Sequence, residues 1–171
     1  MTVFTATFSG VTIATAGGTQ DLFEIVAPAT SRVIIHDIAL AQYSPSDLVD
    51  AEAEIVSLLI MRGHTTSGSG GSTPTASNMN PYSRAAGSVV ETNNTTLASS
   101  GSPETLWADG WHLQAGFIWR LSERTTSLKT EGKILLKPSQ RLVVRMASAV
   151  ADDIVGANGT LLFEEIGKAP I

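Results

Sequence analysis

Alternation of apolar and polar residues with a period of two is the feature that most restricts the fold of this chain. Its clearest instance is residues 105–123, where Trp111 and Trp119 share one parity and His112 and Arg120 share the other. Successive side chains of a β-strand point to opposite faces, so the pattern predicts strands with one packed face and one mixed face. A chain dominated by this period is expected to fold into sheets.

Eight or nine strands are predicted from this alternation and from short apolar runs that end at turn residues. Gly10 predicts a bulge or turn inside the first strand. Asp109-Gly110 predicts a tight turn, because this pair accommodates positive φ. The Asn158-Gly159 pair is expected to end a loop. The predicted strands are residues 3–15, 22–28, 32–44, 53–63, 85–96, 105–123, 132–137, 141–147 and 160–167.

The fold class follows from the number of strands and from the absence of a long amphipathic pattern of helical period. Residues 53–63 form a short apolar run that is also compatible with a helix, and the strand-rich neighbours favour a strand. Many short strands joined by turns rich in Gly, Pro, Asn and Ser predict an antiparallel two-sheet sandwich or jelly roll. We expect one such domain over residues 1–171.

A long polar connection, "RGHTTSGSGGSTPTASNMNPYSR", covers residues 62–84 and interrupts this succession of strands. Connections of more than about 12 residues without secondary structure are uncommon in compact domains. A sandwich with crossing topology must carry some connections over its ends, which accounts for the length. Gly and Ser impose little stiffness, so the connection is expected either to be flexible by itself or to be ordered by a neighbouring subunit.

Two segments are apolar on both predicted faces, residues 33–40 and residues 55–61. Together they offer more apolar surface than one face of a sandwich needs. We therefore expect one of them to lie in an interface between copies of the chain. The second segment supplies Ile55, Leu59 and Met61 as candidate interface residues.

Composition and charge exclude several partners. The 171 residues carry a formal net charge of −5, and Lys and Arg are scattered. Binding to phosphates needs a basic face, so neither a nucleic acid nor an anionic membrane surface is expected as a partner. Charged residues make up 16% of the chain, below the usual value of about 25%. A low charge content suits a protein that packs against neighbours.

The reactive residue types do not form a recognisable catalytic or metal-binding motif. His36, His64 and His112 are far apart in the sequence, and cysteine is absent. Glu164 and Glu165 are expected on opposite faces of a strand, so they do not form a catalytic pair. We interpret the carboxylates as partners of arginines at edges or interfaces, and we expect no enzyme activity, no catalytic residue, no metal and no cofactor. The arginines in question are Arg32, Arg62, Arg141 and Arg145.

An alternative function is suggested by the aromatic residues near the predicted loops. Trp107, Trp111 and Tyr82 are candidates for a platform on which a sugar ring stacks. Aromatic residues on a strand are more often buried in a core or an interface, so these three are equally candidates for interface contacts. Carbohydrate or receptor binding therefore stays open as the alternative.

Five segments resemble small virion proteins of tailed bacteriophages, of the jelly-roll capsid-decoration or head-fibre type. They are "FEIVAP", "AEIVSLLIMRGHTTSGSGGSTPT", "WADGWHLQAGFIW", "RLVVRMAS" and "GTLLFEEIG", within residues 20–167. The resemblance implies a TNF-like jelly roll, a homo-oligomer with a trimer favoured, and a location in the virion after synthesis in the host cytoplasm. It also implies the major capsid protein or another virion protein as a partner, and it supplies no catalytic residues.

Overall fold

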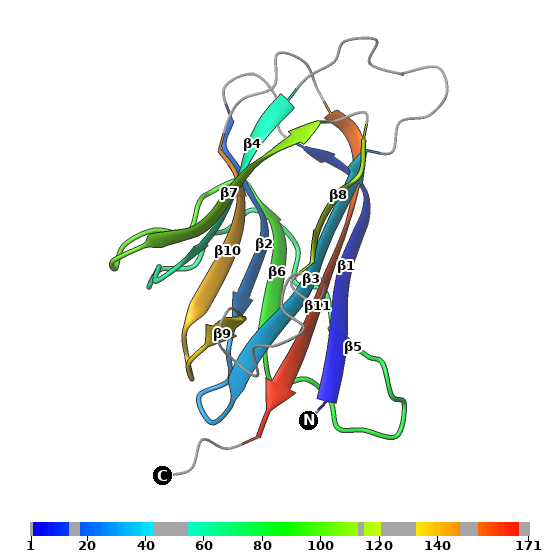
Figure 1. Ribbon diagram of the computed structural model, residues 1–171, viewed down its shortest axis with the longest axis vertical. Coiled ribbons are helices and arrows are strands. Elements are labelled where there is room, and N and C mark those ends of the chain that lie inside the picture. Colours follow the sequence, from blue (N-terminus) through cyan, green and yellow to red (C-terminus); the bar gives the residue numbers. More distant parts are fainter. Residues whose placement is uncertain are drawn as a thin grey trace.

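The structure is a computed structural model that describes residues 2–13, 18–42, 55–112, 115–120, 133–147 and 154–167. Two antiparallel sheets pack against each other (Figure 1). Sheet A has the order β5-β1-β11-β3-β8, and β9 pairs with the other end of β3. Sheet B has the order β6-β2-β10-β4-β7.

The strands have the following bounds. Sheet A contains β1 (Thr2–Ile13), β3 (Arg32–Gln42), β5 (Ser77–Asn78), β8 (Phe117–Arg120), β9 (Ile134–Leu136) and β11 (Ile154–Ile166). Sheet B contains β2 (Gln20–Val26), β4 (Ile55–Arg62), β6 (Val89–Asn94), β7 (Glu104–His112) and β10 (Arg141–Met146). Among the described residues none is helical, and accordingly no helix there could cross a membrane.

The chain alternates between the sheets as it proceeds from β1 to β4. The order β1-β11-β3-β8 in one sheet therefore faces the order β2-β10-β4-β7 in the other, which is the arrangement of a jelly roll. This confirms the predicted all-β, antiparallel sandwich. The short strand β5 and the strand β6 extend the two sheets at the side of β1 and β2 (Figure 1).

The core lies between the sheets and is closed by aromatic contacts. Phe4 stacks on Phe163 within sheet A, with ring centroids 5.6 Å apart. Phe8 of sheet A contacts Phe23 of sheet B at 5.1 Å. Both of these last rings lie against Gly159 of β11, where a side chain would overlap them. The prediction that Asn158-Gly159 ends a loop is wrong, because β11 runs through this position and the glycine makes room for the two rings.

A β-bulge changes the interpretation of the first doubly apolar segment. The register between β3 and β11 shifts between Leu162 and Phe163, and a bulge reverses the parity of the residues beyond it. The prediction that Ile38 and Leu40 lie on the opposite face from Val33 and Ile35 is therefore wrong, whereas Ile34 is buried outside this core, as predicted. The four fully buried residues of the segment all belong to one core, namely Val33, Ile35, Ile38 and Leu40.

The alternation over residues 105–123 spans two strands in different sheets. Trp111 is on β7 of sheet B and Trp119 is on β8 of sheet A, and both are buried. The predicted tight turn at Asp109-Gly110 is wrong, since both residues lie inside β7 and pair with β4. The predicted bulge at Gly10 is confirmed by a register shift beyond Phe8 and by a positive φ of 64° at the glycine.

Candidate functional site

An apolar stripe lies on the outer face of β4, and we call it the β4 stripe. It consists of Ile55, Leu59 and Met61, which alternate with the core residues of the same strand. Ile55 is 69% exposed and the other two are half-buried. The second doubly apolar segment therefore does place apolar side chains outside the core. The stripe lies beside β7, which is one of the two edge strands of sheet B among the described residues.

The middle of the neighbouring strand β7 leaves the stripe accessible because its outward residues there are small, whereas His112 pairs with Ile55 at the end of the strand. Ser57 of β4 pairs with Gly110, and Leu59 pairs with Ala108. A methyl group added to Gly110 would contact the Ile55 side chain at 2.9 Å. Exposed apolar patches next to an unpaired strand edge are typical of association surfaces.

The three predicted aromatic residues do not come together. Trp111 is buried in the core, with 1% exposure, and its indole N–H donates to the Ala115 carbonyl at 3.0 Å. Trp107 is half-buried and packs edge-on against Trp119, with centroids 6.5 Å apart. Tyr82 follows β5, at the opposite edge of sheet A from β8. The structure thus separates Tyr82 from Trp107 and does not assemble a three-residue platform.

The loop that carries Tyr82 is held in place by a buried carboxylate. Glu165 accepts hydrogen bonds from the Arg84 guanidinium, the Gly87 and Ser88 amides and the Ser88 hydroxyl, at 2.7–2.8 Å. Tyr82 nevertheless remains 96% exposed. Glu164, the next residue, lies on the other face and contacts His36 at 3.0 Å. This confirms that the two carboxylates face opposite sides.

The long polar connection is ordered by its own chain. Its first part, residues 63–72, crosses the outer face of sheet B beside residues 95–101, and we call these two segments the cover. Two backbone bridges join the segments, Thr66 with Ser99 and Ser69 with Thr96, and a third joins Ser72 to Thr92 of β6. Neither expected alternative applies to the cover, which is neither a free coil nor in need of a second subunit.

Glycine is required where the cover segments approach each other. A Cβ atom on Gly71 would lie 2.0 Å from the Thr92 carbonyl oxygen, and one on Gly101 would lie 2.3 Å from the Gly63 carbonyl oxygen. Gly101 also has a positive φ of 77°. The glycine-rich sequence thus permits close backbone packing in a folded segment.

Two buried ion pairs hold the cover on sheet B. Asp21 of β2 forms a bidentate pair with Arg145 of β10, at 2.6 and 3.1 Å. The Asp21 carboxylate also accepts the Ala98 amide at 2.7 Å, and Arg145 donates to the Ala98 carbonyl at 2.8 Å. The four groups form a closed set in which each charge has a partner and the cover supplies a backbone donor and acceptor.

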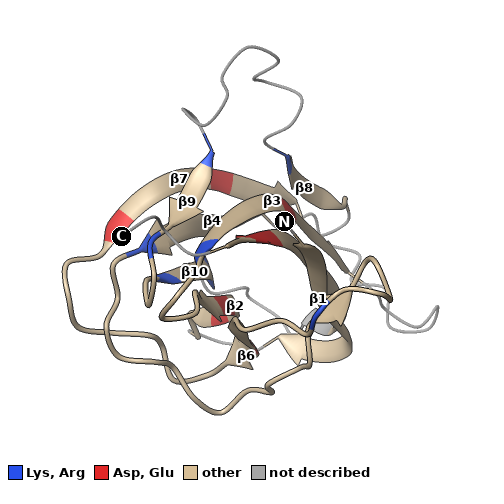
Figure 2. Cartoon of the chain, turned by 90° about the horizontal axis from the view of Figure 1, so that it is seen from below, with Lys and Arg blue, Asp and Glu red and all other residues tan. Residues whose placement is uncertain are grey.

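The second pair repeats this arrangement on the other cover segment. Glu24 of β2 pairs with Arg141 of β10 at 2.5 Å and accepts hydrogen bonds from the Ser67 hydroxyl and the Gly68 amide. Arg141 also donates to the His64 carbonyl at 3.3 Å. Asp21 and Glu24 are at most 1% exposed. The acidic residues of β2 and the basic residues of β10 lie close together in Figure 2.

His64 lies in the cover among these charges. The side chain is 5% exposed, and its Nδ1 atom has no hydrogen-bond partner. Burial, followed by the positive charge of Arg145, lowers the pKa of His64 below its ordinary value of 6.5, against the opposing influence of Asp21 and Glu24. The imidazole is therefore neutral at pH 7, because a proton would add a third cation beside two arginines.

Sequence reasoning identified Arg141 and Arg145 as ion-pair members but missed their partners. Asp21 and Glu24 are the two acidic residues of β2, a strand that is otherwise apolar apart from Gln20. Arg141 and Arg145 alternate with core residues on β10. The sequence does show acidic residues on β2 and basic residues on outward positions of β10. It does not show that β2 and β10 are neighbours in the sheet, and the ion pairs depend on this. Arg62, also predicted to be paired, contacts Glu104 on the exposed surface.

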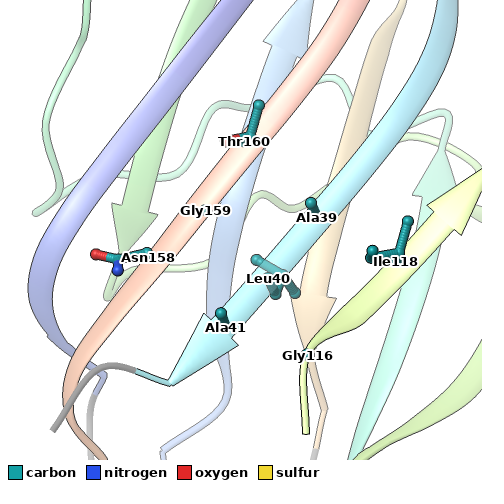
Figure 3. Close-up of a pocket in the computed structure, with 8 residues that line it drawn as sticks. All are labelled: Ala39, Leu40, Ala41, Gly116, Ile118, Asn158, Gly159 and Thr160. Carbon is teal, nitrogen blue, oxygen red and sulfur yellow. The ribbon is translucent and has the colours of Figure 1, made fainter.

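A shallow groove lies on the outer face of sheet A. It has a volume of about 210 Å³, and Figure 3 shows its lining from β3, β8 and β11. Ala39, Ala41 and Ile118 contribute apolar atoms, and no lining residue is charged. Ile118 is largely exposed. The groove offers mainly apolar contact area, and Asn158 and Thr160 are its polar side chains.

No group of three His, Cys, Asp or Glu side chains is positioned to hold a metal ion in the part of the chain that the structure describes. His36 lies on sheet A, His64 lies in the cover and His112 ends β7.

Comparisons with known proteins do not identify a family. No family model matches the chain, and no curated protein matches it. Among solved structures, the alignments include the VP16–VP17 complex of the two major capsid proteins of bacteriophage P23-77 and the VP17 capsid protein of the same phage. Both alignments have 12% identity, cover 94% of this chain and 90% or 88% of the other, and have a TM-score of 0.12. A TM-score this low carries no argument about fold or function.

Proposed function

We propose that this chain is a structural protein of a bacteriophage virion, which associates with itself and binds the capsid surface as a decoration or fibre-base protein. The observation that carries the proposal is the β4 stripe, an apolar surface outside the core beside β7, which ends sheet B in the part of the chain that the structure describes. A sandwich of two antiparallel sheets and the sequence resemblance support the same function. A trimer is the favoured assembly, and the major capsid protein or another virion protein is the expected partner.

The energetic reason for association is the apolar area that a single copy leaves in water. Burial of apolar surface contributes roughly 25 cal/mol per Å². The low charge content of the chain, 16%, reduces the cost of removing water from the surrounding face. Association through the β4 stripe would bury Ile55 and Leu59 without rearranging the sandwich.

A charged side chain in the β4 stripe is expected to dissociate the oligomer. Leu59→Glu and Met61→Glu each place a carboxylate where an apolar contact is proposed, so the affinity between copies should fall by at least tenfold. Analytical ultracentrifugation at micromolar concentration measures the change. Val89→Glu is the matched control, because Val89 is an exposed apolar residue at the β6 edge of the same sheet. Equal behaviour of all three variants and the unmodified protein would sink the proposed interface.

The second candidate function is recognition of a receptor or carbohydrate. It is supported by Tyr82, which is 96% exposed on a loop anchored by Arg84 and Glu165. A rigid, exposed aromatic residue binds at low conformational cost. Screening on a glycan array tests this candidate. Glycan binding that is lost in Tyr82→Ala would support this second function. If no glycan binds, carbohydrate recognition is excluded.

A further inference from the structure

The cover conceals an extension of the β4 stripe. Val143 lies on the outer face of β10, between Arg141 and Arg145, and pairs with Met61. It is fully buried although it is not part of the core between the sheets. Because both flanking arginines contact the cover backbone, Val143 lies beneath the cover. Removal of the cover would therefore join Val143 to Met61 in one larger apolar surface.

The cover is attached mainly by polar contacts. Of its residues 63–72 and 95–101, Ala98 is the buried apolar side chain, whereas the core contains the large aromatic and aliphatic residues of the fold. The attachments are the two ion pairs, the hydrogen bonds that the Ser67 hydroxyl and the Gly68 and Ala98 amides donate to Asp21 or Glu24, and the backbone bonds of Ser72 and Gly63 to β6 and β10. Regions with few buried apolar contacts open at a lower free energy than the core does. The cover can thus detach while the two sheets remain packed.

The charges around His64 are balanced only while its ring is neutral. Asp21 and Arg145 compensate each other, as do Glu24 and Arg141. These four groups act on His64 from β2 and β10. Glu91 of β6 is a further charge near the cover, and it accepts hydrogen bonds from Ser67 and Asn94. Glu91 is not among the charges that act on His64, so a proton on the ring adds one positive charge to a set of four groups that is already neutral.

We propose that the cover is an acid-releasable lid over a concealed part of the β4 stripe, with His64 as the group that responds to protons. Acid opens the cover, exposes Val143 beside Met61, and strengthens contact with a second copy of this chain. The acid release of the cover does not depend on the proposed function, whereas its effect on association rests on the proposed function.

The sign of the effect follows from where the proton binds more readily. In the closed form the pKa of His64 lies below 6.5, and in the open form the ring is in water and titrates near 6.5. The open form therefore binds more protons below this pH, so the closed form loses stability as the pH falls from about 6.5. The ratio of open to closed forms should rise by up to about tenfold per pH unit until the lowered pKa is reached.

Hydrogen exchange of single amides between pH 7.5 and 5.5 tests the release. After correction for the intrinsic rates, protection of the Gly68 and Ala98 amides should fall several-fold toward pH 5.5, whereas protection of the Phe163 amide in the core should stay constant. His64→Gln, which cannot be protonated, should abolish the fall, and His36→Gln is the matched control that should preserve it. A fall that persists in His64→Gln would overturn the assignment. NMR titration of His64 in the unmodified protein is a second measurement, and a pKa at or above 6.5 contradicts the proposal.

The effect on association is read separately from molar mass at the same two pH values. The unmodified protein should associate more strongly at pH 5.5 than at pH 7.5. The pH-dependent increase in association should be smaller in His64→Gln, which keeps all the other titratable groups of the protein. If the cover opens in acid but the molar mass changes equally in both proteins, then opening of the cover does not control association through the β4 stripe. The acid release of the cover is still supported in that case. If the β4 stripe variants already abolish association at pH 7.5 but the cover does not open, the proposed function stands and the lid is wrong.

Discussion

Replacing Gly159 with alanine is expected to lower the free energy of unfolding by about 3 kcal/mol, at the upper end of what overpacking of a core usually costs. The new Cβ atom would lie 2.2 and 2.5 Å from two atoms of the Phe8 ring and 2.9 Å from the Phe23 ring. These rings join the two sheets, so neither can move without loosening the packing of the sandwich. A small methyl group therefore has a large effect at this position.

Urea denaturation followed by tryptophan fluorescence measures this loss. Gly116→Ala is the matched control, because a Cβ atom there would meet only the Leu40 carbonyl oxygen at an ordinary 3.7 Å. We expect the control to change the free energy of unfolding by less than about 0.5 kcal/mol, as surface substitutions usually do. Equal stabilities of the two variants would show that Phe8 and Phe23 do not pack against β11 in the described way.

Replacing Asp21 with alanine is expected to cost about 3–5 kcal/mol, the usual result of removing one partner of a buried ion pair. The change leaves the Arg145 guanidinium without its carboxylate and the Ala98 amide without its acceptor. The Arg145 side chain is only 14% exposed, and the Ala98 amide, which belongs to the cover, forms a buried hydrogen bond, so water replaces the lost partner poorly. Thermal or urea denaturation measures the loss of stability.

Two further variants separate the cost of a buried charge from ordinary truncation. Glu104→Ala removes a partner of Arg62 in an exposed pair and should cost less than about 1 kcal/mol. Adding Arg145→Met to Asp21→Ala should recover part of the stability, because the unpaired cation is then also removed. A double variant that is less stable than Asp21→Ala by the full cost of Arg145→Met alone contradicts the described pairing.

The sequence predicted the strands well where their residues alternate and contain no irregularity. Residues 22–28 and 141–147 correspond to β2 and β10, and the break before Pro138 is present. The prediction failed on β3, where a bulge reversed the parity of the residues beyond it. It failed again at Gly110 and Gly159, because a glycine required by tight packing resembles a glycine required by a turn. Contacts between distant segments distinguish these cases, and a single sequence does not contain them.

The candidate site was predictable in part. Ile55, Leu59 and Met61 were identified from the apolar second face of one segment, and the structure places them outside the core. Asp21 and Glu24 were not identified, because their role depends on β2 lying next to β10 and beneath a connection about 40 residues further along the chain. Trp111 was a candidate contact residue, but burial removes its ring from the surface. The local alternation of residues thus predicted which side chains share a face of a strand. The topology of the fold determines which of these faces are covered by other segments.

Association of copies through the β4 stripe is tested most directly by the molar mass of the unmodified protein. Light scattering coupled to size-exclusion chromatography at micromolar concentration and pH 7.5 measures it. We predict a homogeneous species at a multiple of the 17.9 kDa chain mass, with three copies favoured. A single species at 17.9 kDa across the concentration range would contradict the account.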